Sequence, residues 1–325
     1  MLETAGVSPD AARIAGEVLT DANLSGVDTH GLSRLKPYLG LLGAGHVNAQ
    51  PRFVVEEKSG ALVFDADRGL GQVAGREAIR HAIERARSQA IVGMTIARVG
   101  HLGALGHFTA EAARAGMIAL LVQNGPPIMG MPGSRRPAIG NNPLAFSAPV
   151  PGGPPIVFDV ATSEAAYGKV IEAARAGRPV PDGWALDRDG RPTNDAAAAL
   201  RGTLLPAGAH KGIGLSMLIE VLAGGLTGMV PRNVRPEGLG MPAYFGAFLL
   251  VANPDLLVGR AAFEAHLSDW LSHYKGAGDG IRYPGESSEA LRQSRRRDGV
   301  PLGDELVAEL RGVGTERGVP FPDAR

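Results

Sequence analysis

The sequence of 325 residues contains no cysteine, and that absence removes several kinds of chemistry. Disulfide bonds, thiolate zinc sites and cysteine nucleophiles are all excluded. The chain also has no net charge, because its 33 Lys and Arg residues balance its 33 Asp and Glu residues. A balanced chain has no overall attraction to nucleic acid or to an anionic membrane surface, so we expect neither as a partner.

Several sequence patterns are absent as well. The chain has no H-E-x-x-H motif and no G-x-S-x-G motif, so neither a zinc protease nor a serine hydrolase is indicated, and we expect no metal site. Its first residues lack the basic-then-apolar order of a signal peptide, so we expect a cytoplasmic protein. The apolar stretch at 212–230 carries Glu220 in its middle. Because a carboxylate is costly in lipid, this stretch predicts a buried helix and not a membrane span.

The chain has enough apolar residues, 44%, to bury a sizeable core. Its hydrophobic periodicity predicts helices near both ends, and strands that alternate with helices between them. The predicted strands are 61–66, 92–99, 115–124, 154–163 and 243–253, and the predicted helices are 8–24, 29–42, 76–89, 108–115, a segment from Lys211 and the tail from Ala261. This order predicts an α/β layer in the middle of the chain.

The stretch GLGQVA, residues 69–74, fits the G-x-G-x-x-A pattern of dinucleotide-binding turns. It follows a predicted strand and opens a helix, as that pattern requires. A Rossmann unit would end its next strand in an acidic residue that binds the ribose, whereas residues 98–100 are Arg-Val-Gly. We therefore interpret GLGQVA as a structural turn and not as a cofactor site.

The stretch VDTHGLSRLKPY, residues 27–38, contains Thr29, His30, Arg34 and Tyr38. With Thr29 as the N-cap of the predicted helix, the other three are spaced by four residues and share one helix face. An acid/base group, a fork for a carboxylate and a phenol would then point in one direction. The alternative is a capped surface helix with an exposed arginine.

Three more candidates lie where strands end or helices begin. His101 follows the strand at 92–99 in a glycine-rich turn, a place where ligands of α/β sheets often bind. Asp159, at another strand end, either accepts a hydrogen bond from a ribose or helps to cap the next helix. Lys211 lies in the first turn of a predicted helix, where its charge opposes the helix dipole. A bound phosphate would resolve that conflict by using both the lysine and the free N–H groups of the turn.

Eight segments match one known family, in order, over nearly the whole chain: GVDTHGLSRLKPYLGLLGAGHVN, GLGQVAG, GHLGALGHF, GNNPLAF, FDVATS, PDGWALDRDGRPT, LLPAGAHKGIGL and PGE. They resemble the malate/L-lactate dehydrogenase family that is unrelated to Rossmann-type enzymes. That family also contains ureidoglycolate, sulfolactate and diketogulonate oxidoreductases and cyclic imino-acid reductases. The resemblance implies a non-Rossmann, mixed-sheet α/β cofactor domain at 59–255. It also implies a helical lobe built from both chain ends, 1–58 and 256–325, and a homodimer with the site near the subunit interface.

The resemblance also implies site residues. Substrate-site positions of the family fall on Thr29, His30, Arg34, Tyr38 and His101. Contacts to the cofactor, NAD or NADP, fall on Asn124, Gly125, Asp159, Val160, Ala161, Lys211, Gly285 and Glu286. Imino-acid reductases of the family often have an acidic residue near the position of Lys169, so this lysine favours a 2-hydroxy acid substrate.

The resulting hypothesis is an NAD(P)-dependent oxidoreductase that transfers a hydride between nicotinamide and the α-carbon of a small 2-hydroxy or 2-keto acid. Arg34 would hold the substrate carboxylate, and either His101 or His30 would exchange the proton with the substrate oxygen. We favour His101, because a flexible turn at a strand end can meet both nicotinamide and substrate. Reduction of cyclic imino acids is the alternative within this class. A cofactor-free binding protein on the same fold is the alternative from another class.

Overall fold

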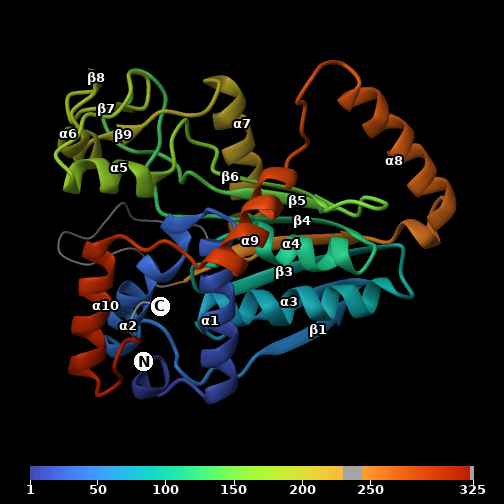
Figure 1. Ribbon diagram of the computed structural model, residues 1–325, viewed down its shortest axis with the longest axis horizontal. Coiled ribbons are helices and arrows are strands. Elements are labelled where there is room, and N and C mark those ends of the chain that lie inside the picture. The colour runs from blue at the N-terminus through green and yellow to red at the C-terminus, as the bar shows by residue number, and fades with distance from the viewer. Residues whose placement is uncertain (230–243, 323–325) are drawn as a thin grey trace.

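The computed structural model describes residues 1–229 and 244–322, and a seven-stranded sheet forms its centre (Figure 1). In order across the sheet, the strands are β1 (Val54–Lys58), β2 (Ala61–Asp65), β3 (Ile91–Val99), β10 (Phe245–Ala252), β4 (Ile118–Gln123), β5 (Leu144–Ala148) and β6 (Ile156–Val160). Strands β2 and β3 pair in parallel, whereas every other neighbouring pair is antiparallel. The sheet is therefore mixed, as expected, and is not the parallel sheet of a Rossmann fold.

Each of the five predicted strands overlaps a strand of the main sheet, but the prediction lacks β1 and β5 of that sheet. Strand β1 is an edge strand of sequence VVEEK, and four of its five residues are exposed, so it shows no apolar alternation. Strand β5 is short and lies between two neighbours inside the sheet. Neither type of strand produces a clear period of two in the sequence.

Helices α3 (Gly71–Ala86) and α4 (Leu105–Arg114) pack against the sheet and against each other (Figure 1). Fully buried side chains from both layers meet there, among them Phe64, Ile79, Met94, Phe108 and Leu121. Burial of a large apolar side chain contributes about 1.5–3 kcal/mol each. This core holds the loops that precede the two helices in place, and the loop before α4 carries His101.

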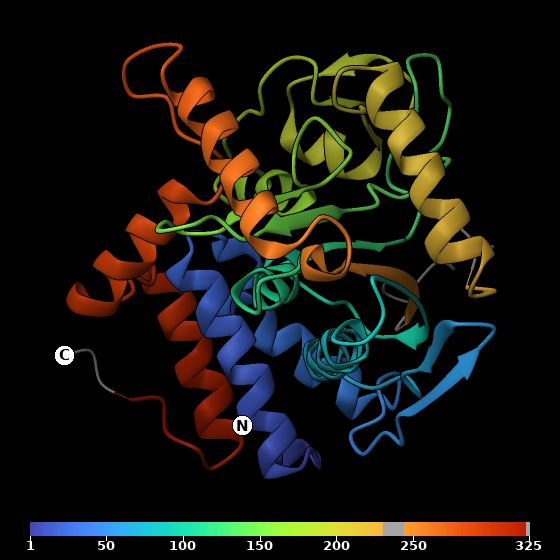
Figure 2. The ribbon, with the colours of Figure 1, turned by 90° about the vertical axis from the view of Figure 1, so that its right-hand side faces the viewer.

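Helices from both chain ends lie side by side (Figure 2). They are α1 (Pro9–Leu24) and α2 (Leu35–Gly43) from the beginning of the chain, and α9 (Glu286–Asp298) and α10 (Asp304–Glu316) from its end. Val313 of α10 is buried in the same apolar cluster as Leu19 of α1 and Tyr38 of α2. The start of α1 is as predicted, with Pro9 at the first helical position and Ser8 accepting a hydrogen bond from Ala11 N at 3.3 Å.

The helix predicted from Thr29 to Leu42 begins later, at Leu35, so this prediction is wrong in its first part. Two 3₁₀ turns, η2 (Asp28–His30) and η3 (Leu32–Arg34), precede it and are separated by Gly31. A Cβ at Gly31 would lie 2.2 Å from Asn23 Oδ1, which accepts a hydrogen bond from Leu32 N. Thr29 is therefore not an N-cap. The later start places Pro37 in the first turn of α2, where a missing N–H is tolerated.

The described residues that follow β6, 161–229, form a smaller unit beside the main sheet (Figure 1). Its elements are α5 (Tyr167–Arg175), β7 (Ala185–Leu186), β8 (Pro192–Thr193), α6 (Ala196–Arg201), β9 (Thr203–Leu204), α7 (His210–Ile219) and the π-helical continuation η4 (Glu220–Gly225). Three more helices, η1 (Glu3–Ala5), η5 (Pro254–Leu256) and α8 (Arg260–Lys275), complete the described elements. None of the helices in the described residues is long and apolar enough to cross a membrane.

Candidate functional site

The glycine turn before α3 lies against protein backbone. A Cβ at Gly71 would lie 2.2 Å from the carbonyl oxygen of His101 and 2.6 Å from that of Gly100. A Cβ at Gly100 would in turn lie 2.7 Å from Gly69 O, with which Gly100 N forms a hydrogen bond. The glycines therefore allow two chain segments to approach each other closely. This packing explains the G-x-G spacing without a bound dinucleotide.

The close approach brings His101 into a cluster with two residues from the 27–38 stretch. Tyr38 Oη lies 2.8 Å from His101 Nδ1. The His30 ring stacks on the His101 ring with centroids 5.5 Å apart and an angle of 29° between the planes. Both histidines retain some exposed surface, so the cluster lines the molecular surface and is open to a ligand.

Thr29 and Arg34 complete this cluster through local contacts. Thr29 Oγ1 lies 3.0 Å from His30 Nδ1, and Arg34 Nε donates to Thr29 O at 2.6 Å. The two terminal nitrogens of Arg34 remain outside that bond. A Cβ at Gly168, in the first turn of α5, would lie 3.0 Å from Thr29 Cβ, so α5 borders the cluster. The structure thus brings the five residues expected at the substrate site together, through 3₁₀ turns and not along one helix face.

Burial and charge keep both histidines neutral. Burial, together with the positive charge of Arg34, lowers the pKa of His30 to about 4. Burial also lowers the pKa of His101 well below its ordinary value, with smaller contributions from His30 and Arg34. Burial raises the pKa of Tyr38 to about 12, although Arg34 and a hydrogen bond from Gln72 act in the opposite direction. At neutral pH the cluster therefore contains two neutral imidazoles and a neutral phenol.

Gln72 belongs to this cluster, and the sequence interpretation missed it. Its side-chain Nε2 lies 3.0 Å from Tyr38 Oη, 3.0 Å from His101 O and 3.3 Å from Leu102 O. The residue is completely buried. Its only signal in the sequence is that a polar residue stands among the apolar and small ones of GLGQVA.

Asn124 is occupied by contacts within the chain. Its Nδ2 donates to Glu220 Oε1 at 3.0 Å and to Met229 O at 2.8 Å, and its Oδ1 accepts from Gly246 N at 3.0 Å. The side chain therefore has little capacity left for a cofactor. The neighbouring Gly125 is different, because a Cβ there would meet no atom within 4 Å, so its backbone borders open space.

Asp159 lies at the end of β6 and caps the start of α4. Its Oδ2 accepts a hydrogen bond from Gly106 N at 2.8 Å. Burial of the carboxyl raises its pKa to about 6, although hydrogen bonds from the N–H groups of Gly106 and Leu105 act in the opposite direction. Another part of the residue is exposed to solvent. Of the two roles considered for Asp159, capping is present, but for α4 and not for the helix that follows in sequence. The next residue, Val160, is 39% exposed.

Lys211 lies in the first turn of α7, close to the residues that follow Asp159. Ala207 N donates to Thr162 O at 2.9 Å, which joins the segment after Ala161 to the loop before α7. The Lys211 side chain is exposed and has no ion-pair partner in the described parts of the chain. The expectation of free N–H groups is wrong for two residues of this turn, because Lys211 N bonds to Gly208 O and Gly212 N to Ala207 O. A phosphate could therefore contact the Lys211 side chain but not these two N–H groups.

Gly285 and Glu286 lie against the beginning of β6. Val157 N donates to Pro284 O at 2.9 Å, and a Cβ at Gly285, whose φ is +112°, would lie 2.4 Å from Pro155 O. Glu286 pairs with Lys275 Nζ at 2.6 Å and accepts from the backbone N of Tyr283 at 2.9 Å. The carboxylate of Glu286 is therefore engaged within the chain.

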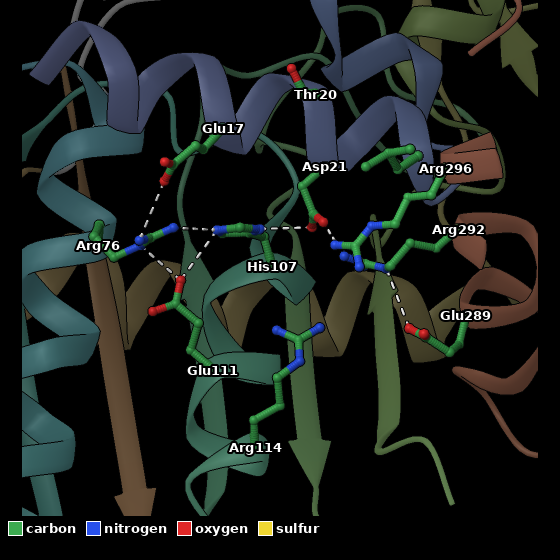
Figure 3. Close-up of a pocket in the computed structure, with 11 residues that line it drawn as sticks. Glu17, Thr20, Asp21, Arg76, His107, Glu111, Arg114, Glu289, Arg292 and Arg296 are labelled. Atoms are coloured by element: carbon green, nitrogen blue, oxygen red, sulfur yellow. Dashed lines mark hydrogen bonds and ion pairs between the residues drawn. The ribbon is translucent and has the colours of Figure 1, made fainter. Parts of the chain in front are cut away.

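A separate hollow of about 680 Å³ lies between α1, α3, α4 and α9 (Figure 3). His107 Nδ1 lies 2.7 Å from Asp21 Oδ2, Asp21 also pairs with Arg292, and Arg76 Nε lies 2.8 Å from Glu111 Oε1. These contacts tie the helix from the chain end to α1 and α4. His107 thus has a structural role inside α4, and the hollow is a different place from the histidine cluster.

Comparisons with known proteins agree on one family. The family model described as malate/L-lactate dehydrogenase matches residues 1–311. The (2R)-3-sulfolactate dehydrogenase (NADP(+)) of Chromohalobacter salexigens is 36% identical over 97% of this chain and 95% of its own length. The ureidoglycolate dehydrogenase (NAD(+)) of Escherichia coli O157:H7 is 33% identical, over 94% and 90%. The structure of delta1-piperideine-2-carboxylate reductase from Pseudomonas syringae superposes with a TM-score of 0.88 at 34% identity, covering 96% of this chain and 95% of that one.

Proposed function

Since the chain belongs to the malate/L-lactate dehydrogenase family, we propose that it is an NAD(P)-dependent oxidoreductase acting on a small 2-hydroxy or 2-keto acid. The observation that carries the proposal is the cluster of His30, Tyr38 and His101 with Arg34 beside it. A carboxylate with an adjacent carbonyl requires a neutral imidazole at a surface opening and a guanidinium that can bind the carboxylate. Within residues 1–229 and 244–322, the terminal nitrogens of Arg34 make no hydrogen bond.

Each side chain of the cluster has its own role in this proposal. The terminal nitrogens of Arg34 bind the substrate carboxylate, since its Nε is already bonded to Thr29 O. His101 exchanges the proton with the substrate oxygen, and Tyr38 orients its ring through Nδ1. Thr29 orients His30, which lies over the His101 ring and contacts the carboxylate end of the substrate.

Nicotinamide supplies the hydride for reduction and accepts it in oxidation. We propose that the cofactor lies along Gly125, Asp159, Val160, Ala161 and Lys211. The open space at Gly125, the exposed Val160 and the exposed ammonium of Lys211 fit such a ligand. Asn124, Gly285 and Glu286, which the family resemblance also indicates, would border this path and shape it through their contacts within the chain. Both NAD and NADP stand in the names of relatives, so we propose either as the cofactor.

Reduction of a cyclic imino acid is the second candidate, favoured by the similarity to the piperideine-carboxylate reductase structure. The hydride step is the same, with a C=N carbon in place of the carbonyl carbon. Lys169 favours the hydroxy acid. Its neighbour Gly168 lies close to Thr29, so the start of α5 is beside the substrate cluster. An acidic residue there would favour a protonated imine, and a lysine does not.

A direct spectrophotometric assay tests the function. Oxidation of NADH and NADPH is followed by the loss of reduced-nicotinamide absorbance. The substrates are pyruvate, oxaloacetate, oxoglutarate and cyclic imines. We expect turnover with a 2-keto acid, and a fall in kcat of about 10²–10⁴-fold in His101→Ala. Absence of turnover with every substrate would contradict the proposal, and turnover with imines alone would select the second candidate.

We also propose a homodimer. Helix α7 stands at the edge of the molecule (Figure 2). The stretch predicted as a buried helix is therefore only partly buried, because large apolar side chains on α7 and η4 are exposed. These are Leu215 (45%), Met217 (57%), Leu218 (50%), Val221 (63%) and Leu226 (58%). A second copy of the chain would cover this face, because contiguous exposed apolar surface is typical of a subunit interface. The molar mass from light scattering tests this, and a monomer at micromolar concentration would contradict it.

We also propose that the chain divides into a cofactor domain, residues 59–255, and a helical lobe built from residues 1–58 and 256–325.

A further inference from the structure

The orientation of the Gln72 side-chain amide is determined by its neighbours. The amide nitrogen lies 3.0 Å from His101 O and 3.3 Å from Leu102 O. Both of these atoms are backbone carbonyl oxygens, which only accept hydrogen bonds. The reversed amide would place Oε1 against two carbonyl oxygens in a completely buried place, which is unfavourable. Gln72 therefore presents N–H groups, and not its oxygen, to this side of the cluster.

The same nitrogen lies 3.0 Å from Tyr38 Oη, so Tyr38 accepts a hydrogen bond from Gln72. The remaining partner of the phenol in the described residues is His101 Nδ1, at 2.8 Å. If His101 donated from Nδ1, the phenol oxygen would accept twice and its own proton would have no acceptor. Tyr38 is only 5% exposed, so an orphaned hydroxyl proton would be costly. The phenol proton therefore points to His101 Nδ1.

We propose that Gln72 is a positioning residue which, through Tyr38, holds His101 in the tautomer that carries its proton on Nε2. A neutral imidazole that accepts at Nδ1 must carry its hydrogen on Nε2. In residues 1–229 and 244–322, no hydrogen bond occupies that Nε2. His101 thus presents a proton donor to the substrate oxygen. This last step rests on the proposed function, whereas the tautomer itself does not.

The arrangement also allows the proton to be relayed during reduction. As the hydride reaches the carbonyl carbon, the Nε2–H bond of His101 breaks and its proton moves to the substrate oxygen. The Tyr38 O–H bond breaks at the same time, and a new N–H bond forms at His101 Nδ1. Burial raises the pKa of Tyr38 to about 12, and the positive charge of Arg34 and the hydrogen bond from Gln72 act in the opposite direction, so these two residues favour the resulting phenolate. After product release, water protonates His101 Nε2 and the Nδ1 proton returns to the phenolate oxygen, which restores the starting tautomer.

Ring-¹⁵N-labelled histidine provides a test that does not depend on activity. Nitrogen chemical shifts distinguish a protonated ring nitrogen from an acceptor nitrogen, and His101→Gln identifies the His101 signals. In the wild-type protein at pH 7.5 we expect Nε2–H and an acceptor Nδ1. In Gln72→Met, which keeps the volume and removes the donor, we expect a mixture of both tautomers. An Nδ1–H tautomer in the wild type would overturn the inference, whether or not any variant folds.

Gln123 offers a matched control. It is 2% exposed and holds the same loop, with Oε1 accepting from Leu102 N at 3.0 Å and Nε2 donating to Gly100 O at 3.0 Å, but it does not contact Tyr38. Gln123→Met should therefore retain the wild-type tautomer of His101.

Steady-state kinetics provide the second readout. For Gln72→Met we expect kcat for keto-acid reduction to fall about 10- to 100-fold, the usual effect of losing a partner that orients a histidine, while KM changes little. A folded Gln72→Met with the wild-type kcat would overturn the inference. A wild-type protein without turnover would count against the proposed function alone, and the nitrogen shifts would still decide the tautomer.

Discussion

Replacement of Gly71 by alanine tests the interpretation of the glycine turn most directly. The added Cβ would lie 2.2 Å from His101 O, whereas ordinary contacts begin at 3.4 Å, so one of the two segments must shift by about 1.2 Å. The opposing atoms are backbone atoms of Gly100 and His101, which cannot rotate aside as a flexible side chain would. Alanine favours a helix over glycine by about 0.8–1.0 kcal/mol, but overpacking of this kind costs about 1–3 kcal/mol.

The displacement acts on catalysis because it moves His101. A misplacement of about 1 Å in a reacting group can lower the rate about 10²-fold. We therefore expect Gly71→Ala to lose about two orders of magnitude in kcat and several degrees in Tm, while its affinity for the nicotinamide cofactor stays unchanged.

Three measurements on one preparation check this prediction: thermal unfolding, kcat for keto-acid reduction, and cofactor Kd from nucleotide fluorescence. Gly93→Ala is the matched control, because it lies in β3, the strand that leads to His101. Its Cβ would meet only Phe248 Cζ, at 3.8 Å, so it should behave like the wild type. A folded Gly71→Ala with wild-type kcat would refute the packing argument. A cofactor Kd raised tenfold with kcat intact would show instead that the turn binds the dinucleotide.

Three further predictions concern other parts of the molecule. Arg34→Lys keeps a charge but loses the planar fork, so the substrate KM should rise strongly while cofactor Kd, measured by fluorescence, changes little. Lys211→Ala should raise the cofactor Kd about 10- to 100-fold, through loss of one charge-assisted contact of about 1.5–3 kcal/mol, without a change in Tm. Burial opposes the charged forms of His107 and Asp21, yet their mutual hydrogen bond and neighbouring charges raise the pKa of His107 and lower that of Asp21. The contribution of His107 to stability is complete below its ordinary pKa of 6.5 and is lost as the pH rises through its pKa in the folded protein. The contribution of Asp21 is complete above its ordinary pKa of 3.8 and is lost as the pH falls through its pKa in the folded protein. The Tm difference between wild type and His107→Gln should therefore be largest between pH 3.8 and 6.5 and shrink toward alkaline pH, and a difference that grows above pH 8 would contradict the assignment.

Local signals in the sequence were sufficient for much of the fold. Ser8 and Pro9 predicted the start of α1, because a cap and a pre-set φ act within one turn of the helix. The alternation of apolar residues predicted the central strands, because each strand buries one of its faces in the same core. The missing acidic residue after the strand at 92–99 excluded a Rossmann site, which agrees with the mixed sheet. The start of the helix expected at Thr29 was wrong, because Gly31 interrupts it to make room for the side chain of Asn23.

The sequence by itself determined which residue types were available at the candidate site, and the order of motifs determined the family. Only the tertiary structure decided which of them act on one another. The bond between Gln72 and Tyr38 spans 34 positions, that between Gly106 and Asp159 spans 53, and that between Asn124 and Gly246 spans 122. A hydrogen bond depends on a distance of about 3 Å and on direction, and no period or cap in the sequence encodes either across such separations. The proton position on His101 depends on that kind of contact, and it is therefore a property of the folded chain alone.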